Sequence, residues 1–213
     1  MRSNRTTRAI SATALGLTLA LTSAACGNDA DGGDTSAEVS TTEHNDADVA
    51  FASEMLQHHA QALAMVDLTM GRDLDPEVQQ LADEIRAAQA PEIETFTDWL
   101  TDWDEEIPST MRDHANADHE DGEAGAAMEG MEAGSMDMPG MMSAADMTAL
   151  EDAPDSKFQD MWLEMMIEHH TGAIDMAEAE TEQGQYKPAI DLAEEIATSQ
   201  AGEIDTMENL LAS

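Results

Sequence analysis

Two stretches of the sequence decide the fold. Residues 51–65 read FASEMLQHHAQALAM, and residues 162–176 read WLEMMIEHHTGAIDM. When the chain is moved along itself by 111 positions, these stretches align, and the same shift also places residues 81–93 on residues 192–204. A single shift that aligns both segments indicates two copies of one helical hairpin. The matched pairs in the first stretch are Met55 with Met166, His58 with His169, His59 with His170, Ala62 with Ala173 and Met65 with Met176.

Each aligned segment has the spacing of a helix. Ala52, Leu56, His59, Leu63 and Val66 follow one another at steps of four, three, four and three, which is the period of one helical face. The following segment has the start signal of a second helix, with an Asp-Pro pair at residues 75–76. Two amphipathic helices in each of two copies predict an all-α protein, a four-helix bundle built from two duplicated hairpins.

The first 25 residues have the pattern of a signal peptide. Arg2, Arg5 and Arg8 precede an uncharged apolar run at residues 10–21. The small residues at 23–25 stand directly before Cys26 and resemble the lipobox of a bacterial lipoprotein, with Ser23 where that box usually has Leu. We therefore expect export, with Cys26 lipidated and anchored to the outer face of the cell membrane, or otherwise secretion. Residues 26–46, rich in Gly, Ser, Thr and acid, predict a flexible tether.

The remaining residues, 47–213, form the predicted bundle. Residues 47–103 make the first hairpin, residues 104–154 an acidic, Met-rich crossover, and residues 155–213 the second hairpin. The crossover as far as about residue 142 is rich in Asp, Glu, Gly and Ala, so we expect it to be long and mostly disordered. Ser143 followed by Asp146 predicts a short capped helix just before the second hairpin.

The composition excludes several classes of function. The 213 residues carry 46 Asp and Glu against 8 Lys and Arg, a formal net charge of −38, so the chain cannot neutralise the phosphates of a nucleic acid. A single Cys rules out a disulfide framework and a CxxC site. Only 3% of the residues are aromatic while 17 are Met, which predicts an aliphatic, thioether-rich core. The sequence does not identify a protein partner.

Methionine and histidine share one helical face in both copies. Residues three or four apart lie together on a helix, so Met55 neighbours His58 and His59. A core would accept Leu or Ile at these positions, yet both copies retain them while Gln61 and its counterpart Gly172 differ. This retention favours metal binding over simple packing. The predicted ligands are Met55, His58, His59, Met65, Met165, Met166, His169, His170 and Met176.

The type of ligand predicts the metal. Thioethers and imidazoles without a thiolate suit Cu(I), and by analogy Ag(I), better than hard cations. Methionine also has no acidic proton and cannot be lost to a disulfide outside the cell. In a disordered crossover there is no core for sulfur to fill, so auxiliary Cu(I) ligands are predicted there, with compositional drift or a Met-rich docking patch as the alternatives. These auxiliary residues are Met128, Met131, Met136, Met138, Met141 and Met142.

Enzyme sites that such a bundle can carry are missing from the sequence. A di-iron carboxylate site needs Glu-x-x-His, but the residues three before the four histidines are Met55, Leu56, Met166 and Ile167. His-Glu-x-x-His and a Gly-rich phosphate loop are absent, and no Cys is available as a nucleophile. We therefore predict a protein that is not an enzyme.

Three functions remain open. The first is binding of Cu(I) for copper buffering or tolerance at the cell surface. The second is a structural or interaction protein that binds no metal, in which buried His pairs are hydrogen-bonded and the acidic surface docks a cationic partner. The third is a pH sensor, in which the negative field favours imidazolium and the bundle loosens as the His pairs become charged.

The run MMIEHHTGAIDM at residues 165–176, together with His58 and His59, resembles the secreted domain-of-unknown-function family 305. The resemblance extends over about residues 45–213 and implies a ferritin-like four-helix fold made from a duplicated hairpin. Because the family includes a periplasmic copper-binding protein, it also implies copper. The first copy departs from the fuller pattern at Gln57, Gln61 and Ala64, which implies a weaker or merely structural site in that copy.

Overall fold

The computed structural model describes residues 39–111 and 138–213, which lie within one compact unit, Ser36–Ser213. Cys26, the predicted signal peptide and most of the predicted tether lie outside the described residues. Within the described part the structure is helical and has no strand, which confirms the predicted all-α four-helix bundle. Its helices are α1 (Asp46–Asp67), α2 (Pro76–Asp102), α4 (Ala144–Glu151), α5 (Asp155–Gln183) and α6 (Lys187–Leu211). No helix among these is both long and apolar enough to cross a membrane.

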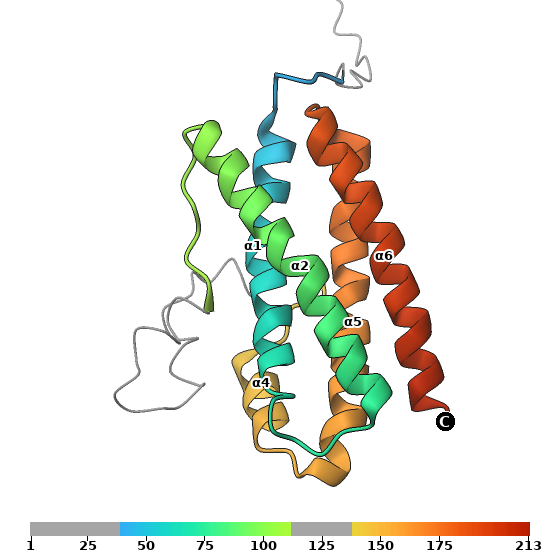
Figure 1. The fold of residues 1–213 in the computed structure, drawn as a ribbon. Helices are drawn as coiled ribbons and strands as arrows, with labels where there is room; N and C mark the ends of the chain where they lie inside the picture. Colours follow the sequence, from blue (N-terminus) through green and yellow to red (C-terminus); the bar gives the residue numbers. More distant parts are fainter. Residues whose placement is uncertain (1–38, 112–137) are drawn as a thin grey trace, which may run out of the picture. The chain divides into compact units, whose positions relative to one another are not determined.

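The four long helices form two hairpins that meet along one seam. Helix α1 packs on α2, α5 packs on α6, and the hairpins join mainly through α1 and α5 (Figure 1). These two central helices are antiparallel, because Asn45 before α1 donates a hydrogen bond to the Gln183 carbonyl at the end of α5. At the opposite end, Trp162 Nε1 donates to the Met65 carbonyl at 3.0 Å. The two copies of the repeat thus face each other head to tail.

Local sequence fixes where the helices begin. The Asn45 side chain accepts hydrogen bonds from the first turn of α1 while Asp48 accepts one from the Asn45 backbone, which forms a capping box. Asp75 caps α2 directly before Pro76, as predicted. Ser143 and Asp146 form a second capping box at α4, which confirms the predicted short helix.

The core divides into two apolar clusters along the α1–α5 seam. One contains Met65 and Met166 with Trp162 and the buried residues of α4. The other contains Met55 and Met176 with Phe51 and Phe96. Each central helix has its pair of histidines between the stretches that belong to the two clusters. The bundle therefore has a polar layer enclosed between two apolar ones.

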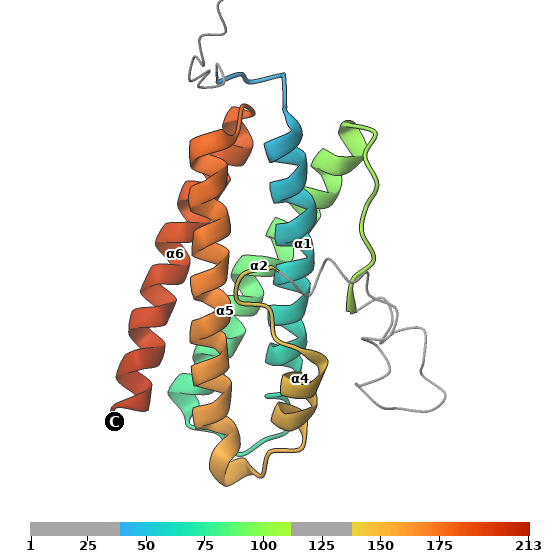
Figure 2. The same cartoon turned by 180° about the vertical axis from the view of Figure 1, so that it is seen from behind.

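A short segment before α4 is inserted over this seam. We call residues 138–143 the strap, and Figure 2 shows it crossing α1 and α5. The Gln61 side chain on α1 donates to the Met142 carbonyl at 2.9 Å and accepts from the Met142 amide at 2.7 Å. On α5, Gly172 lies so close to the Pro139 carbonyl that an added Cβ would clash with it. Gly140 has a φ of 72°, and a Cβ there would lie 2.6 Å from the Glu168 carbonyl.

The strap corrects one expectation from the sequence. Residues up to about 142 were expected to be mostly disordered, with no core for their methionines to fill. In the structure Met138 and Met142 are buried and Met141 is partly buried, each packed against one of the two clusters. Packing therefore accounts for these three sulfurs, and the premise that they have no core to fill is wrong. Their role as auxiliary metal ligands stays a prediction. Met128, Met131 and Met136 lie outside the described residues.

Candidate metal centre

Four histidines form the centre of the polar layer, and all four have no exposed surface. His58 on α1 and His169 on α5 lie against each other, with ring centroids 3.8 Å apart and ring planes inclined by 41°. His59 and His170 lie on the outer sides of this pair, toward α2 and α6. Residues 111 positions apart thus take equivalent places about the seam.

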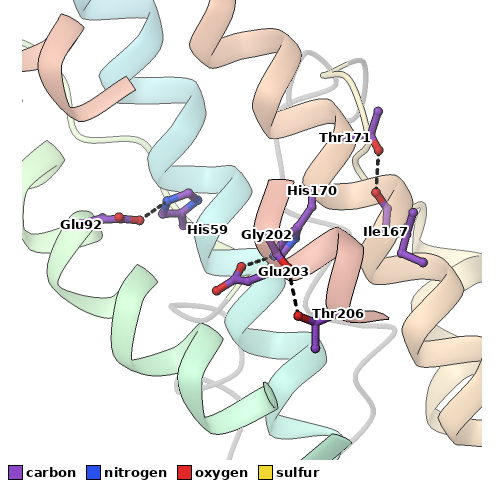
Figure 3. A network of polar contacts seen from close by, with 8 residues as sticks. All are labelled: His59, Glu92, Ile167, His170, Thr171, Gly202, Glu203 and Thr206. Atoms are coloured by element: carbon purple, nitrogen blue, oxygen red, sulfur yellow. Dashed lines mark hydrogen bonds and ion pairs between the residues drawn. The ribbon is translucent and has the colours of Figure 1, made fainter. Parts of the chain in front are cut away.

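Each outer histidine has a carboxylate partner on the other helix of its own hairpin. His59 Nε2 lies 2.7 Å from Glu92 Oε2, and His170 Nε2 lies 2.7 Å from Glu203 Oε2 (Figure 3). A neutral imidazole that donates its Nε2–H to a carboxylate presents a bare lone pair at Nδ1. This arrangement fixes the tautomer and the orientation of the ring, as carboxylates do for histidines that ligate metals.

The central pair is uncharged. His58 Nε2 donates to the Pro139 carbonyl of the strap at 3.0 Å, which leaves its Nδ1 as an acceptor. Burial, followed by the nearby His59, lowers the pKa of His58 to about 3. Burial and His58 lower the pKa of His169 well below its ordinary value. The expectation that the negative surface would favour imidazolium is therefore wrong for these two rings, because desolvation outweighs the field.

Five buried imidazole nitrogens in this layer make no hydrogen bond. They are Nδ1 of His58, His59, His169 and His170, together with Nε2 of His169. Leaving a buried polar group unpaired costs about 1–3 kcal/mol. A neutral imidazole keeps one N–H, so one of the two His169 nitrogens carries a hydrogen and the layer offers at most four lone pairs. These lone pairs fit a cation that accepts electron pairs from imidazole. The side chain of Gln89, also buried here, makes no hydrogen bond either.

The thioethers lie on both sides of the histidines. Met55 and Met176 belong to one apolar cluster, while Met65, Met165 and Met166 belong to the other. All five are at least nine-tenths buried. The repeat predicted one set of ligands in each copy, but antiparallel packing combines sulfurs from different copies and brings the two central rings together. The four predicted histidines thus share one layer, and the five predicted methionines belong to the apolar clusters on its two sides.

Sequence reasoning missed the carboxylates of this layer. Glu92 and Glu203 align at the same shift as the histidines, as do Gln89 and Gln200. In each copy the Glu follows its His partner by 33 positions, on the next helix. The retained pairs were a visible signal, but the sequence did not show that a residue so distant along the chain lies opposite the imidazole.

The donor set also limits which metals fit. Among residues 39–111 and 138–213, no group of three or more His, Cys, Asp and Glu side chains is placed to hold a metal ion. A site made from three or more of those side chains alone is thus absent from this part of the chain. Any site in the layer needs the methionine sulfurs as well as imidazole, which favours a soft ion.

Comparisons with known proteins support the fold. A structure of a DUF305 fragment from Deinococcus radiodurans is 27% identical, covers 79% of this chain and 97% of its own, and superimposes with a TM-score of 0.64. A DUF305 protein from Streptomyces coelicolor, described as secreted, is 30% identical, covers 78% of this chain and 91% of its own, and has a TM-score of 0.63.

CopM in its Cu(II)-bound form is 26% identical, covers 78% of this chain and 95% of its own, and has a TM-score of 0.59. No curated protein matches the sequence. The family described as domain of unknown function (DUF305) matches residues 48–211. The match spans both hairpins and the crossover, in agreement with the resemblance at the His-His motifs, and the chain therefore belongs to the DUF305 family.

Proposed function

We propose that this protein binds Cu(I), or Ag(I) as its chemical analogue, in the polar layer between the two hairpins. The observation that carries the proposal is the set of unpaired buried imidazole nitrogens, enclosed on both sides by methionine sulfur. Neutral rings are needed for this role because a protonated imidazole cannot ligate a metal, and burial keeps His58 and His169 neutral.

A monovalent soft ion suits the layer better than a divalent one. Thioether sulfur is a soft, uncharged ligand, and it binds soft monovalent ions such as Cu(I) and Ag(I) better than hard divalent ions. Glu92 and Glu203 supply negative charge one step further out, through the imidazoles that they hold. The histidines and methionines of the layer would hold the cation, and the two carboxylates would orient the imidazole ligands.

Two relatives support copper as the element and an extracytoplasmic location, without bearing on the oxidation state. The CopM relative was solved with copper, as Cu(II), and the Streptomyces coelicolor relative is described as secreted. By analogy we infer that this chain acts outside the cytoplasm in copper buffering or tolerance. Lipidation of Cys26 is part of the proposal and would hold the protein at the outer face of the cell membrane.

Leucine in place of methionine tests the sulfur ligands. One variant carries Met55→Leu with Met176→Leu, and a second carries Met65→Leu with Met166→Leu. Because Leu and Met have similar volumes, both variants should remain folded, while Cu(I) affinity falls by about tenfold or more. Affinity is measured by competition with a chromogenic Cu(I) chelator.

The matched control is Met147→Leu, which makes the same substitution at a buried methionine on α4, away from the histidines. Its Cu(I) affinity should equal that of the native chain. If both double variants also retain native affinity, the sulfurs are not ligands. The layer is then a structural His–Glu network, which is the second candidate and is favoured by the two hydrogen-bonded His–Glu pairs.

A further inference from the structure

A cavity of about 290 Å³ opens beside the polar layer, between α1 and α5. Its floor is formed by buried residues, among them Phe51, Met176 and Glu180. Pro139 of the strap, whose carbonyl accepts the His58 hydrogen bond, forms part of its wall. The rim carries the exposed carboxylates Glu54 and Asp175. No lysine or arginine lines it, so the cavity is acidic from its rim to its floor.

The floor contains an acid that the fold leaves without a donor. Glu180 is only 2% exposed, lines the cavity, and neither of its carboxyl oxygens receives a hydrogen bond from an N–H or hydroxyl group. Burial, reinforced by the neighbouring Asp48 carboxyl, raises its pKa to about 9. Asp48 accepts backbone N–H groups of Gln185 and Tyr186. This raised pKa keeps the carboxyl protonated near neutral pH, so it offers an entering cation two unpartnered oxygens and gains a negative charge only when its proton leaves.

The other end of the bundle shows that the fold does not require this acid pair. Asp48 aligns with Gln159 in the repeat, and the Gln159 side chain accepts the Asp75 amide at 2.9 Å. Asp48 accepts the equivalent Tyr186 amide, also at 2.9 Å. Glu180 aligns with Thr69, a buried residue that satisfies its own hydroxyl within the chain. A neutral pair thus closes the same turn at one end, while the turn beside the cavity has the buried acids Asp48 and Glu180 in its place.

We propose that this cavity is the access route by which a soft monovalent cation reaches the polar layer. The inference rests on the proposed function and names the path to that site. The rim carboxylates raise the local concentration of cations, as acidic clefts generally do. Met176 on the floor offers the first thioether, and it belongs to the same cluster as Met55. A cation that enters here meets sulfur before it meets imidazole.

Charge removal tests the route by its effect on the association rate. The cavity variant combines Glu54→Gln and Asp175→Asn, which removes the two exposed carboxylates of the rim. The control combines Glu194→Gln and Glu195→Gln, which removes two exposed carboxylates on α6. Ag(I) association is followed by stopped-flow tryptophan fluorescence in chloride-free buffer. The cavity variant should associate about 3- to 10-fold more slowly than the control, and the gap should narrow as ionic strength rises.

Steric closure distinguishes a route from a binding site. Ala179 is an exposed residue on the rim, and Ala179→Phe should narrow the opening. Association and dissociation of Ag(I) should then slow together with an unchanged dissociation constant. Ala201→Phe, at an exposed position on α6, should leave both rates unchanged.

Two failures are distinguishable. If the native chain binds no Ag(I), the proposed function is wrong and the route is overturned with it. If Ag(I) binds but the cavity and control variants associate at equal rates, or Ala179→Phe leaves both rates at native values, only the route is overturned.

Discussion

Replacing Glu180 by Gln should stabilise the protein in a strongly pH-dependent way. The carboxyl has a pKa of about 9 in the folded bundle against 4.5 as its ordinary value. The folded state therefore binds this proton more tightly than the unfolded state does. Its contribution to stability is fully present below pH 4.5 and is lost as the pH rises toward 9.

The size of the effect follows from the shift. Each pKa unit corresponds to about 1.4 kcal/mol, so at pH 7 the 2.5 units above the unfolded value correspond to about 3 kcal/mol. Glutamine has the same shape, is always neutral, and can donate to Asp48 as the protonated acid does. Glu180→Gln should therefore raise the free energy of unfolding by up to about 3 kcal/mol at pH 7, and the melting temperature by roughly 5–10 °C.

Thermal and urea unfolding between pH 6.5 and 8.5 provide the cleanest assay. The histidines are the same in the native and variant chains, so their contribution cancels in the difference between the two and Glu180 dominates it. The native chain should lose about 3 kcal/mol across the window relative to the variant. The exposed substitution Glu195→Gln serves as the control and should leave the native slope unchanged. Parallel curves for native protein and Glu180→Gln would refute the assignment of a neutral, buried acid.

Three other predictions concern the strap and the polar layer. Gly172→Ala should force the Pro139 carbonyl away from α5, lower the unfolding free energy by about 1–3 kcal/mol, and speed hydrogen exchange in the strap. Gly202→Ala has open space around its Cβ and should instead raise the unfolding free energy by about 0.5–1 kcal/mol. If the two glycine substitutions change the unfolding free energy equally, the close approach of Gly172 to the Pro139 carbonyl is contradicted. Glu92→Gln with Glu203→Gln should keep the fold but weaken Ag(I) binding by about 10–100-fold in a calorimetric titration, and native affinity would remove the carboxylates from the site. Finally, the lowered pKa of His58 should reduce the free energy of unfolding as the pH falls from 6.5 toward 3, because in this range only the unfolded ring takes up a proton. In the native chain the opposite pH dependence of Glu180 offsets part of this loss, so the decline should be steeper in Glu180→Gln. A flat profile in that variant would contradict the prediction.

The apparent divergence of the repeat has a structural cause. Gln61 and Gly172 align but differ, and the sequence alone suggested a weaker or merely structural first copy. In the structure both residues contact the same strap, one through a pair of hydrogen bonds and the other by having no side chain. A single strap cannot make identical contacts with two symmetry-related helices. The difference therefore reflects how the crossover is seated.

The sequence by itself determined the helices, their caps, the duplication and the inward-facing residues. These follow from local spacing, because a helical period places His58 and Met55 on one face wherever the helix lies. Only the tertiary structure decided that α1 and α5 run antiparallel. That packing sets His58 against His169, combines sulfurs from different copies, and brings Glu92 and Glu203 to the outer rings.

The strap and the acidic cavity also depend on tertiary packing that the sequence does not show. Met138 and Met142 looked like residues of an unstructured linker, but they fill gaps left between the two hairpins. Such contacts join positions about 80 or more apart in the chain, and they depend on the shapes of both surfaces. A repeat shows that two units are alike, whereas their packing decides which side chains meet.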